Sequence, residues 1–300
     1  MRIIKPITVN DTIFDTSNVT EDDFAAWDAS TSYSIGNKVI VISTHTIYES
    51  AANTNSGNNP TTDTVNWFPI GATNRWKAFD KKISDPTTRT GSITYTLQDA
   101  ATSITALAFF GLVGSTVNVT VTTAAGSEVY NVTKSLVETD GIDDWYTYFF
   151  NENVIKTELL FLSIPPYNNS EIDITITTGA SDTAEVGQIV LGSLIPFGIT
   201  TYGTSIGIED YSSKDVDAFG NFIITERAFS NTADFDIKYL TKDARRIQNT
   251  LATLRAKPIV FIGSDDASYG LVLYGFYRRF DLTLETPSYS FGSIEVEGLT

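Results

Sequence analysis

Apolar and polar residues alternate along the middle of the chain. Three runs place an apolar side chain at every second position, with threonine, asparagine or aspartate between them: 93–97, 117–121 and 172–176. A period of two turns one side of a strand to a core and the other to water. Turn sequences such as Ala125-Gly126-Ser127 separate the runs. Residues 81–190 are therefore predicted to form an antiparallel β-sandwich of the jelly-roll type.

Two other stretches in this region are continuously apolar. They are residues 106–113 and 158–164. A short apolar run without alternation is typical of a strand that is buried on both faces. Both stretches are predicted to be central strands of the sandwich.

The C-terminal region, residues 191–300, is also rich in β-forming residues. Its predicted strands lie near 206–211, 222–229, 258–263, 270–277, 280–284 and 290–297. The first residues, 1–20, form a leader in which Arg2 to Val9 reads as one strand. We expect this leader to combine with residues 191–300 in one β domain.

One segment of the C-terminal region has helical rather than strand periodicity. Ala244, Ile247, Leu251 and Leu254 recur at spacings of three and four, which predicts a helix near 241–255 with one apolar stripe. Thr241 is the expected N-cap residue, because its hydroxyl suits the free amides of a first turn. The fold class is therefore mainly β, a multi-domain antiparallel sandwich with one α-helix.

Residues 21–80 form a separate small module that is rich in aromatic residues. Its loop, 53–63, is dense in glycine, asparagine and proline. The pattern consists of Trp27, Tyr33, Gly36, Val39, Tyr48, Gly57, Pro60 and Trp67. It resembles the chitin-binding type 3 family of carbohydrate-binding modules, which implies a three-stranded sheet on an aromatic frame. The resemblance implies sugar-stacking aromatics at positions that Ala52 and Asn53 occupy here, so we expect a docking role rather than sugar binding by that face.

Composition limits the function. The chain of 300 residues has a formal net charge of −16, and nucleic-acid binding requires the opposite sign. It holds no cysteine, so disulfides, thiolate metal sites and thiol catalysis are excluded. No apolar run is long enough to span a membrane as a helix, and the first ten residues lack the pattern of a secretory signal.

The sequence offers little for catalysis. Its one histidine, His45, stands in a strand-like stretch, and no nucleophile elbow or phosphate-binding loop is present. Asp143 and Asp144 beside Trp145 read as solvated loop acids rather than as a glycosidase pair. The pattern that starts at Asp215-Val216-Asp217 lacks the spacing of an EF-hand. We therefore expect no enzyme activity and no cofactor, and we assign no metal site, with a structural calcium ion in the jelly roll as the alternative.

A second resemblance covers most of the chain. The matching runs are 71–80, 189–192, 197–203, 227–230, 275–277 and 294–300. In this order they are similar to blocks of predicted phage tail proteins that carry a jelly roll. The resemblance implies a structural protein of a tail tip or distal tail, in the virion and assembled in the host cytoplasm. Its implied partners are further copies of itself, in a trimeric or hexameric ring, together with tube and hub proteins and, as a separate option, host-surface glycan.

Two sets of residues are candidate contact sites. Tyr274, Phe276, Arg278 and Arg279 combine aromatic and arginine side chains, a composition typical of interface centres. The alternative, equally good, is that these residues simply alternate between the two faces of an ordinary strand. Trp145, Tyr146 and Tyr148 are the first candidates for sugar contact. A free-standing carbohydrate-binding adhesin is the alternative function, and a glycan depolymerase is the third.

Overall fold

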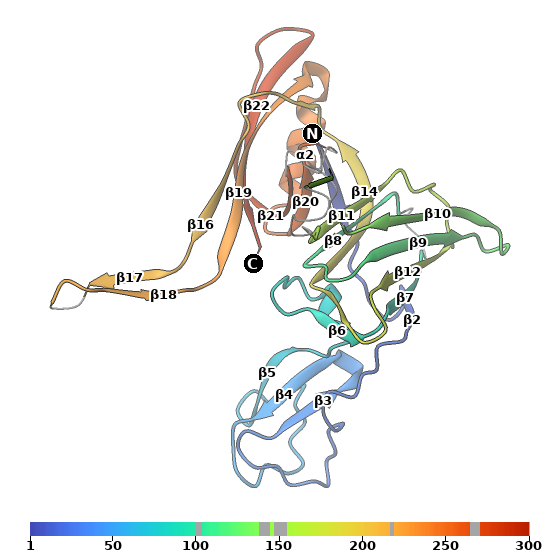
Figure 1. Cartoon of the computed structure of the whole chain (residues 1–300), viewed down its shortest axis with the longest axis vertical. Coiled ribbons are helices and arrows are strands. Elements are labelled where there is room, and N and C mark those ends of the chain that lie inside the picture. Colours follow the sequence, from blue (N-terminus) through green and yellow to red (C-terminus); the bar gives the residue numbers. More distant parts are fainter. Residues whose placement is uncertain (100–103, 138–144, 147–154, 217–218, 265–270, 300) are drawn as a thin grey trace.

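The computed structural model describes residues 1–99, 104–137, 145–146, 155–216, 219–264 and 271–299. Over these ranges the protein is mainly β, with several antiparallel sheets and one α-helix, as the sequence predicts. No helix in the described ranges is long and apolar enough to cross a membrane. Figure 1 shows a central body from which a small module and a long two-stranded arm project in different directions.

The predicted sandwich is present. One layer is a five-stranded sheet in the order β10 (Glu128–Ser135), β9 (Thr116–Thr122), β12 (Glu171–Thr177), β7 (Ile93–Gln98) and β2 (Phe14–Ser17). The second layer consists of β11 (Glu158–Leu162), β8 (Ala106–Phe110) and β14 (Gln188–Pro196). The alternating residues of β7, β9 and β12 bury one face against this second layer, so the period-two prediction is confirmed. A short pair, β6 (Thr87–Thr90) and β13 (Thr183–Val186), lies beside the sandwich.

The two continuous apolar stretches have different positions. All five residues of β8 are buried, and β8 lies between β11 and β14, as predicted. The prediction for the second stretch is wrong, because β11 is the edge strand of its sheet and its burial alternates. Leu159 and Phe161 face the sandwich core, whereas Leu160 and Leu162 are partly buried on the other face.

The second layer of the sandwich continues without a break into the C-terminal region. The sheet runs β11-β8-β14-β1-β20-β21-β22-β19-β15, and β16 also pairs with β19. Its remaining strands are β1 (Arg2–Pro6), β15 (Ile199–Thr200), β16 (Ser205–Asp210), β19 (Phe229–Leu240), β20 (Ile259–Ile262), β21 (Val272–Thr283) and β22 (Tyr289–Gly298). The leader strand β1 joins the two halves, because it pairs with β14 on one side and β20 on the other.

This long sheet curls. Phe110 of β8 and Tyr274 of β21 stack with ring centroids 5.5 Å apart. Four strand spacings separate β8 from β21, which would be about 19 Å in a flat sheet. The contact therefore requires strong curvature, and the concave side encloses a compact apolar cluster of Ile4, Ala106, Ala108, Phe110, Val190, Val260, Ile262 and Tyr274.

The helix α2 (Ala244–Thr253) covers the other face of the C-terminal strands. Ile247, Leu251 and Leu254 pack against side chains of β1, β19, β20, β21 and β22. The predicted N-cap is wrong, since residues Thr241–Asp243 form a 3-10 turn and the α-helix starts after Asp243. The Thr241 hydroxyl contacts the carbonyl oxygen of Thr286 instead.

Two strand boundaries also differ from prediction. Residues 222–229 are not one strand, because β18 (Phe222–Thr225) ends before β19 begins at Phe229. Residues 270–277 and 280–284 are not two strands, because one strand, β21, runs from Val272 to Thr283 with a register shift between Tyr277 and Arg279. The register shift is a β-bulge, which accommodates one extra residue without ending the strand. In the sequence, the interrupted alternation suggests a break between two strands.

The small module is the expected three-stranded sheet, in the order β3 (Lys38–Val41), β4 (Thr46–Ser50) and β5 (Trp67–Ala72). Tyr33, Val39 and Trp67 are buried together, and Trp27 and Tyr48 pack against them. The 3-10 turn η1 (Ile42–Thr44) joins β3 to β4, and η2 (Lys77–Phe79) lies in the connection to the sandwich.

Candidate assembly surface

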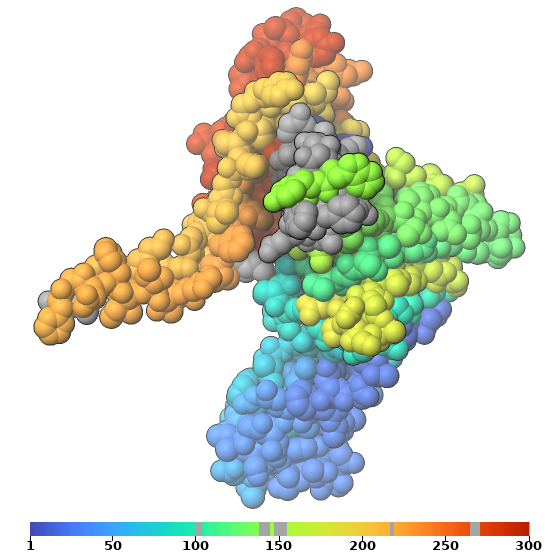
Figure 2. Space-filling model, in the orientation of Figure 1, coloured from blue at the N-terminus to red at the C-terminus, as the bar shows by residue number. Residues whose placement is uncertain are grey.

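The arm in Figure 1 carries many exposed apolar side chains. It starts as the pair β16 and β19 and continues as the hairpin of β17 (Ser213–Val216) with β18. Figure 2 shows that the outer part of the arm projects away from the body. Its large exposed apolar side chains are Ile206, Ile208, Val216, Phe219, Phe222, Ile223, Ile224 and Phe229.

The register of the hairpin separates its side chains into two faces. Residues directly opposite each other in an antiparallel pair share a face, and here Val216 faces Phe222 while Lys214 faces Ile224. This apolar face contains three large hydrophobic residues, and Phe222 is 74% exposed and Ile224 67% exposed. The opposite face presents Ser213, Asp215, Ile223 and Thr225. The hairpin is thus amphipathic, although nothing in the described chain covers its apolar face.

A two-stranded hairpin is marginally stable by itself in water. Exposed contiguous apolar surface on a β-ribbon favours contact with another protein surface. The arm therefore has the chemistry of an assembly element, which gains stability when a partner covers it.

The base of the arm is held to the body by a polar cluster. The Arg278 guanidinium of β21 donates to Glu297 of β22 at 2.8 Å and to Glu209 of β16 at 2.9 Å. The Tyr211 hydroxyl lies 2.8 Å from the same Glu297 carboxylate. These contacts with Arg278 and Tyr211 hold the pKa of Glu297 below its usual value. Arg278 thus adds a side-chain link between β16 and β21 to the backbone pairing of β16 with β19.

A cavity of about 490 Å³ lies between the arm base and the edge of the sandwich. Its lining includes Ile206 and Ile208 of β16, Val272 and Leu273 of β21, and Glu158 of β11. Burial raises the pKa of the Glu158 carboxyl to about 7. Glu158 is therefore a carboxyl group that changes charge near neutral pH beside the base of the arm.

The candidate interface residues of β21 do not share one environment. Tyr274 is 4% exposed and belongs to the apolar cluster inside the curled sheet. Phe276 is exposed, Arg278 makes the contacts described above, and Arg279 pairs with Asp281 at 2.8 Å. The Tyr274 ring is thus a core group in this chain. The assignment of Phe276, Arg278 and Arg279 to a subunit interface stays a prediction.

The structure describes two of the three candidate sugar-contact residues. Trp145 is 78% exposed and Tyr146 is also exposed, whereas Tyr148 lies outside the described residues. The acidic turn that precedes Trp145 lies outside them as well. In the small module, Trp27 and Tyr48 are part of the packed frame.

Two features of the structure were not predicted from the sequence. The arm was not, because its alternation is that of any half-buried strand. The contacts of His45 were not either, because they join segments far apart in the chain. Within the described ranges, no group of three or more histidine, aspartate or glutamate side chains is placed to hold a metal ion. The search of protein-family models, curated proteins and solved structures finds no match to this chain.

Proposed function

We propose that this protein is a homo-oligomeric structural component of a phage tail tip, in which the arm joins neighbouring copies. The observation that carries the proposal is the uncovered apolar face of the β17–β18 hairpin, formed by Val216, Phe222 and Ile224. The resemblance of runs along the sequence to phage tail proteins supplies the biological setting.

The direction of the arm favours a second copy as its partner. The arm leaves the body at one edge, so its tip lies far from its own core (Figure 1). An element that projects from one side and contacts a different surface on the next copy makes a head-to-tail interface. Such interfaces close into rings when the rotation per copy divides a full turn. A trimeric or hexameric ring, carried on the tube and hub proteins of a tail, is the assembly that we propose.

Charge substitution on the hairpin tests the role of the arm. Phe222→Asp with Ile224→Asp places two carboxylates on the apolar face, and burying them in an interface is costly. The matched control, Ser213→Asp with Thr225→Asp, adds the same charge to the opposite face of the same strands. We expect light scattering and native mass spectrometry to show oligomers for the wild type and the control, and monomers for the apolar-face variant. Oligomers of unchanged size in the apolar-face variant would show that this face does not join copies.

A second experiment tests the biological setting. Antibody labelling of virions that contain this chain should place it at the distal end of the tail. The free-standing adhesin predicts instead a monomer that binds glycans without any virion. The depolymerase predicts release of reducing sugar from host polysaccharide, and clear turnover would contradict the structural proposal.

A further inference from the structure

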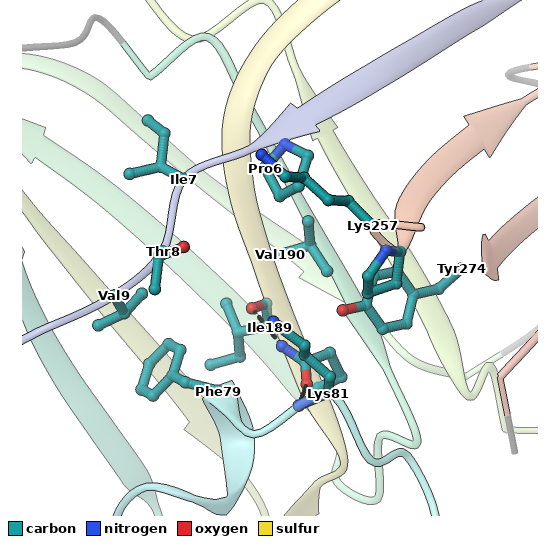
Figure 3. A pocket seen from close by; sticks show the side chains of 12 residues that line it. Pro6, Ile7, Thr8, Val9, Phe79, Lys81, Ile189, Val190, Lys257 and Tyr274 are labelled. Carbon is teal, nitrogen blue, oxygen red and sulfur yellow. Dashed lines mark hydrogen bonds between the residues drawn. The ribbon is translucent and has the colours of Figure 1, made fainter. Parts of the chain in front are cut away.

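A small pocket lies where four parts of the chain meet (Figure 3). The leader after β1, the loop that follows η2, strand β14 and the C-terminal region all contribute to its wall. Its volume is about 170 Å³, which is smaller than the usual site of a drug-sized ligand. Apolar groups form much of the wall: Ile7, Val9, Phe79, Ile189, Val190 and Pro258.

The hydroxyl of Tyr274 is the polar group at the centre of this pocket. The side chain is 4% exposed, and Figure 3 shows its oxygen pointing into the space between Val190 and Lys81. Within the described chain, the hydroxyl has no hydrogen-bond partner at all. Burial raises the pKa of Tyr274, so the hydroxyl keeps its proton and remains a hydrogen-bond donor.

Two lysines flank the same pocket. Lys81 follows η2, and Lys257 follows α2, where Figure 3 shows its side chain extending along the pocket toward Pro6. Neither ammonium group forms an ion pair within the described residues. Both lysines line the one pocket, and the chain around them carries a net charge of −16. Their charges attract an anion, against the repulsion of the net negative chain.

The pocket wall is held in place before any ligand arrives. The buried Gln188 side chain accepts a hydrogen bond from the backbone N–H of Lys81 at 2.7 Å and donates one to the carbonyl oxygen of Ile189 at 3.0 Å. These two bonds fix the loop that carries Lys81 against β14. Such preorganisation reduces the ordering cost of binding.

One acidic group opposes an anion here. Asp80 adjoins the pocket and contributes to the raised pKa of Tyr274. Burial raises the pKa of Asp80 itself, although Lys77 and Lys82 counteract that effect. Lys81 and Lys257 line the pocket itself, whereas Asp80 is not part of its lining.

We propose that this pocket binds a small carboxylate ligand. The carboxylate accepts from the Tyr274 hydroxyl and pairs with Lys81 and Lys257, and its carbon body packs on the apolar wall. A phosphate is a poorer fit, because it has no carbon body to pack on the apolar wall and would set charged oxygens against that wall. A bound ligand touches the leader, the sandwich and the C-terminal region together, so it stabilises their junction by mass action.

Titration of the full chain with propionate tests the proposal. Sodium chloride at equal ionic strength controls for general salt effects, and inorganic phosphate is the comparison anion. We expect saturable heat in calorimetry and a rise in the melting temperature with propionate, with weaker effects from phosphate. Absence of saturable propionate binding would overturn the proposal, as would phosphate binding that is equal or tighter.

Three variants locate the binding. Tyr274→Phe removes the hydroxyl and keeps the ring, and Lys257→Gln removes an exposed charge. Each should weaken propionate binding by roughly tenfold, the value of one charge-assisted hydrogen bond. Lys242→Gln removes an exposed lysine outside the pocket and should leave the affinity unchanged. Affinity that is insensitive to both Tyr274→Phe and Lys257→Gln would place the ligand elsewhere and overturn the proposal.

Discussion

The imidazole of His45 lies flat on the indole of Trp76, with ring centroids 4.0 Å apart. The Phe14 ring also stacks on Trp76, at 4.7 Å. This stack joins His45 of the small module, Trp76 of the segment between the module and the sandwich, and Phe14 of the sandwich. Carboxylates hold the imidazole at both nitrogens, since Nδ1 lies 3.0 Å from Glu21 and Nε2 lies 2.7 Å from Asp11. The single histidine is thus a docking residue of the small module.

Substitutions in this stack should separate docking from folding. His45→Ala removes a half-buried ring at the surface of the sandwich, so we expect a small loss of stability and a more mobile module. Nitrogen-15 relaxation of residues 24–72 measures that mobility. His45→Phe keeps the stack and removes the carboxylate contacts, so it shows which of the two holds the module. A module that tumbles no more freely in His45→Ala would contradict the docking role.

Trp76→Ala should have a larger effect on the whole protein. Trp76 is buried and packs on Phe14 and Phe79 as well as His45. Truncation of a buried aromatic side chain costs about 3–5 kcal/mol. Chemical denaturation should therefore show a loss of that size for the sandwich. A loss below about 1 kcal/mol would mean that the indole is not part of the sandwich core.

Stability should fall as pH rises because of Glu158. Its pKa is raised by burial from 4.5 to about 7 in the folded protein. Between these two values the folded state binds the proton more tightly than the unfolded state does, so the contribution to stability is fully present below pH 4.5 and is lost toward pH 7. At about 1.4 kcal/mol per pKa unit, the loss is at most about 3.5 kcal/mol. Glu158→Gln should flatten this part of the profile of unfolding free energy against pH, and an unchanged slope would contradict it.

The polar cluster at the arm base should restrain β16. Arg278→Gln breaks the contacts with Glu209 and Glu297, so amide hydrogen exchange in residues 205–210 should become several-fold faster. Arg279→Gln is the matched control, because Arg279 pairs with Asp281 within its own strand. Equal exchange in both variants would show that Arg278 does not restrain the arm. If the two arginines are also interfacial, the double variant should weaken oligomerisation.

Gly192 should not tolerate a side chain. A Cβ at this position of β14 would lie 1.9 Å from the carbonyl oxygen of Lys5 on the neighbouring β1. Gly192→Ala must push the two strands apart, so we expect a loss of roughly 3 kcal/mol or more. Gly126→Ala is the comparison, because nothing lies within 4 Å and only its φ of +79° is unfavourable. That variant should lose about 1 kcal/mol, by thermal or chemical unfolding. Equal losses would argue against the close approach at Gly192.

Local patterns predicted the elements that depend on local chemistry. The alternation of residues 117–121 and 172–176 identified strands whose burial is set by a period of two. The apolar run 106–113 contains a central strand, whereas the similar run 158–164 contains an edge strand. The two runs look alike because the apolar content of a strand depends on how deeply it is buried. It does not depend on whether the strand has a neighbour on one side or on both.

Features that depend on distant segments were out of reach. The leader was expected to join residues 191–300, but no local signal specifies that Arg2–Pro6 pairs on both sides, with β14 nearly 200 positions away and with β20 nearly 260 positions away. The pocket around Tyr274 needs the curl of the same sheet. The exposed face of Phe222 and Ile224 was missed because a strand sequence does not state which of its faces remains uncovered.

The unbroken sheet has a mechanical consequence for the arm. Strand β19, from which the arm extends, is hydrogen-bonded to β22 along most of its length, and β22 is hydrogen-bonded to β21. A pull along these strands loads many backbone hydrogen bonds at once, and β20 and β1 pass the strain on to the sandwich. A force applied to the arm by a neighbouring molecule is therefore transmitted to the whole body. The β17–β18 hairpin, which has only two strands, should unfold before the main sheet does.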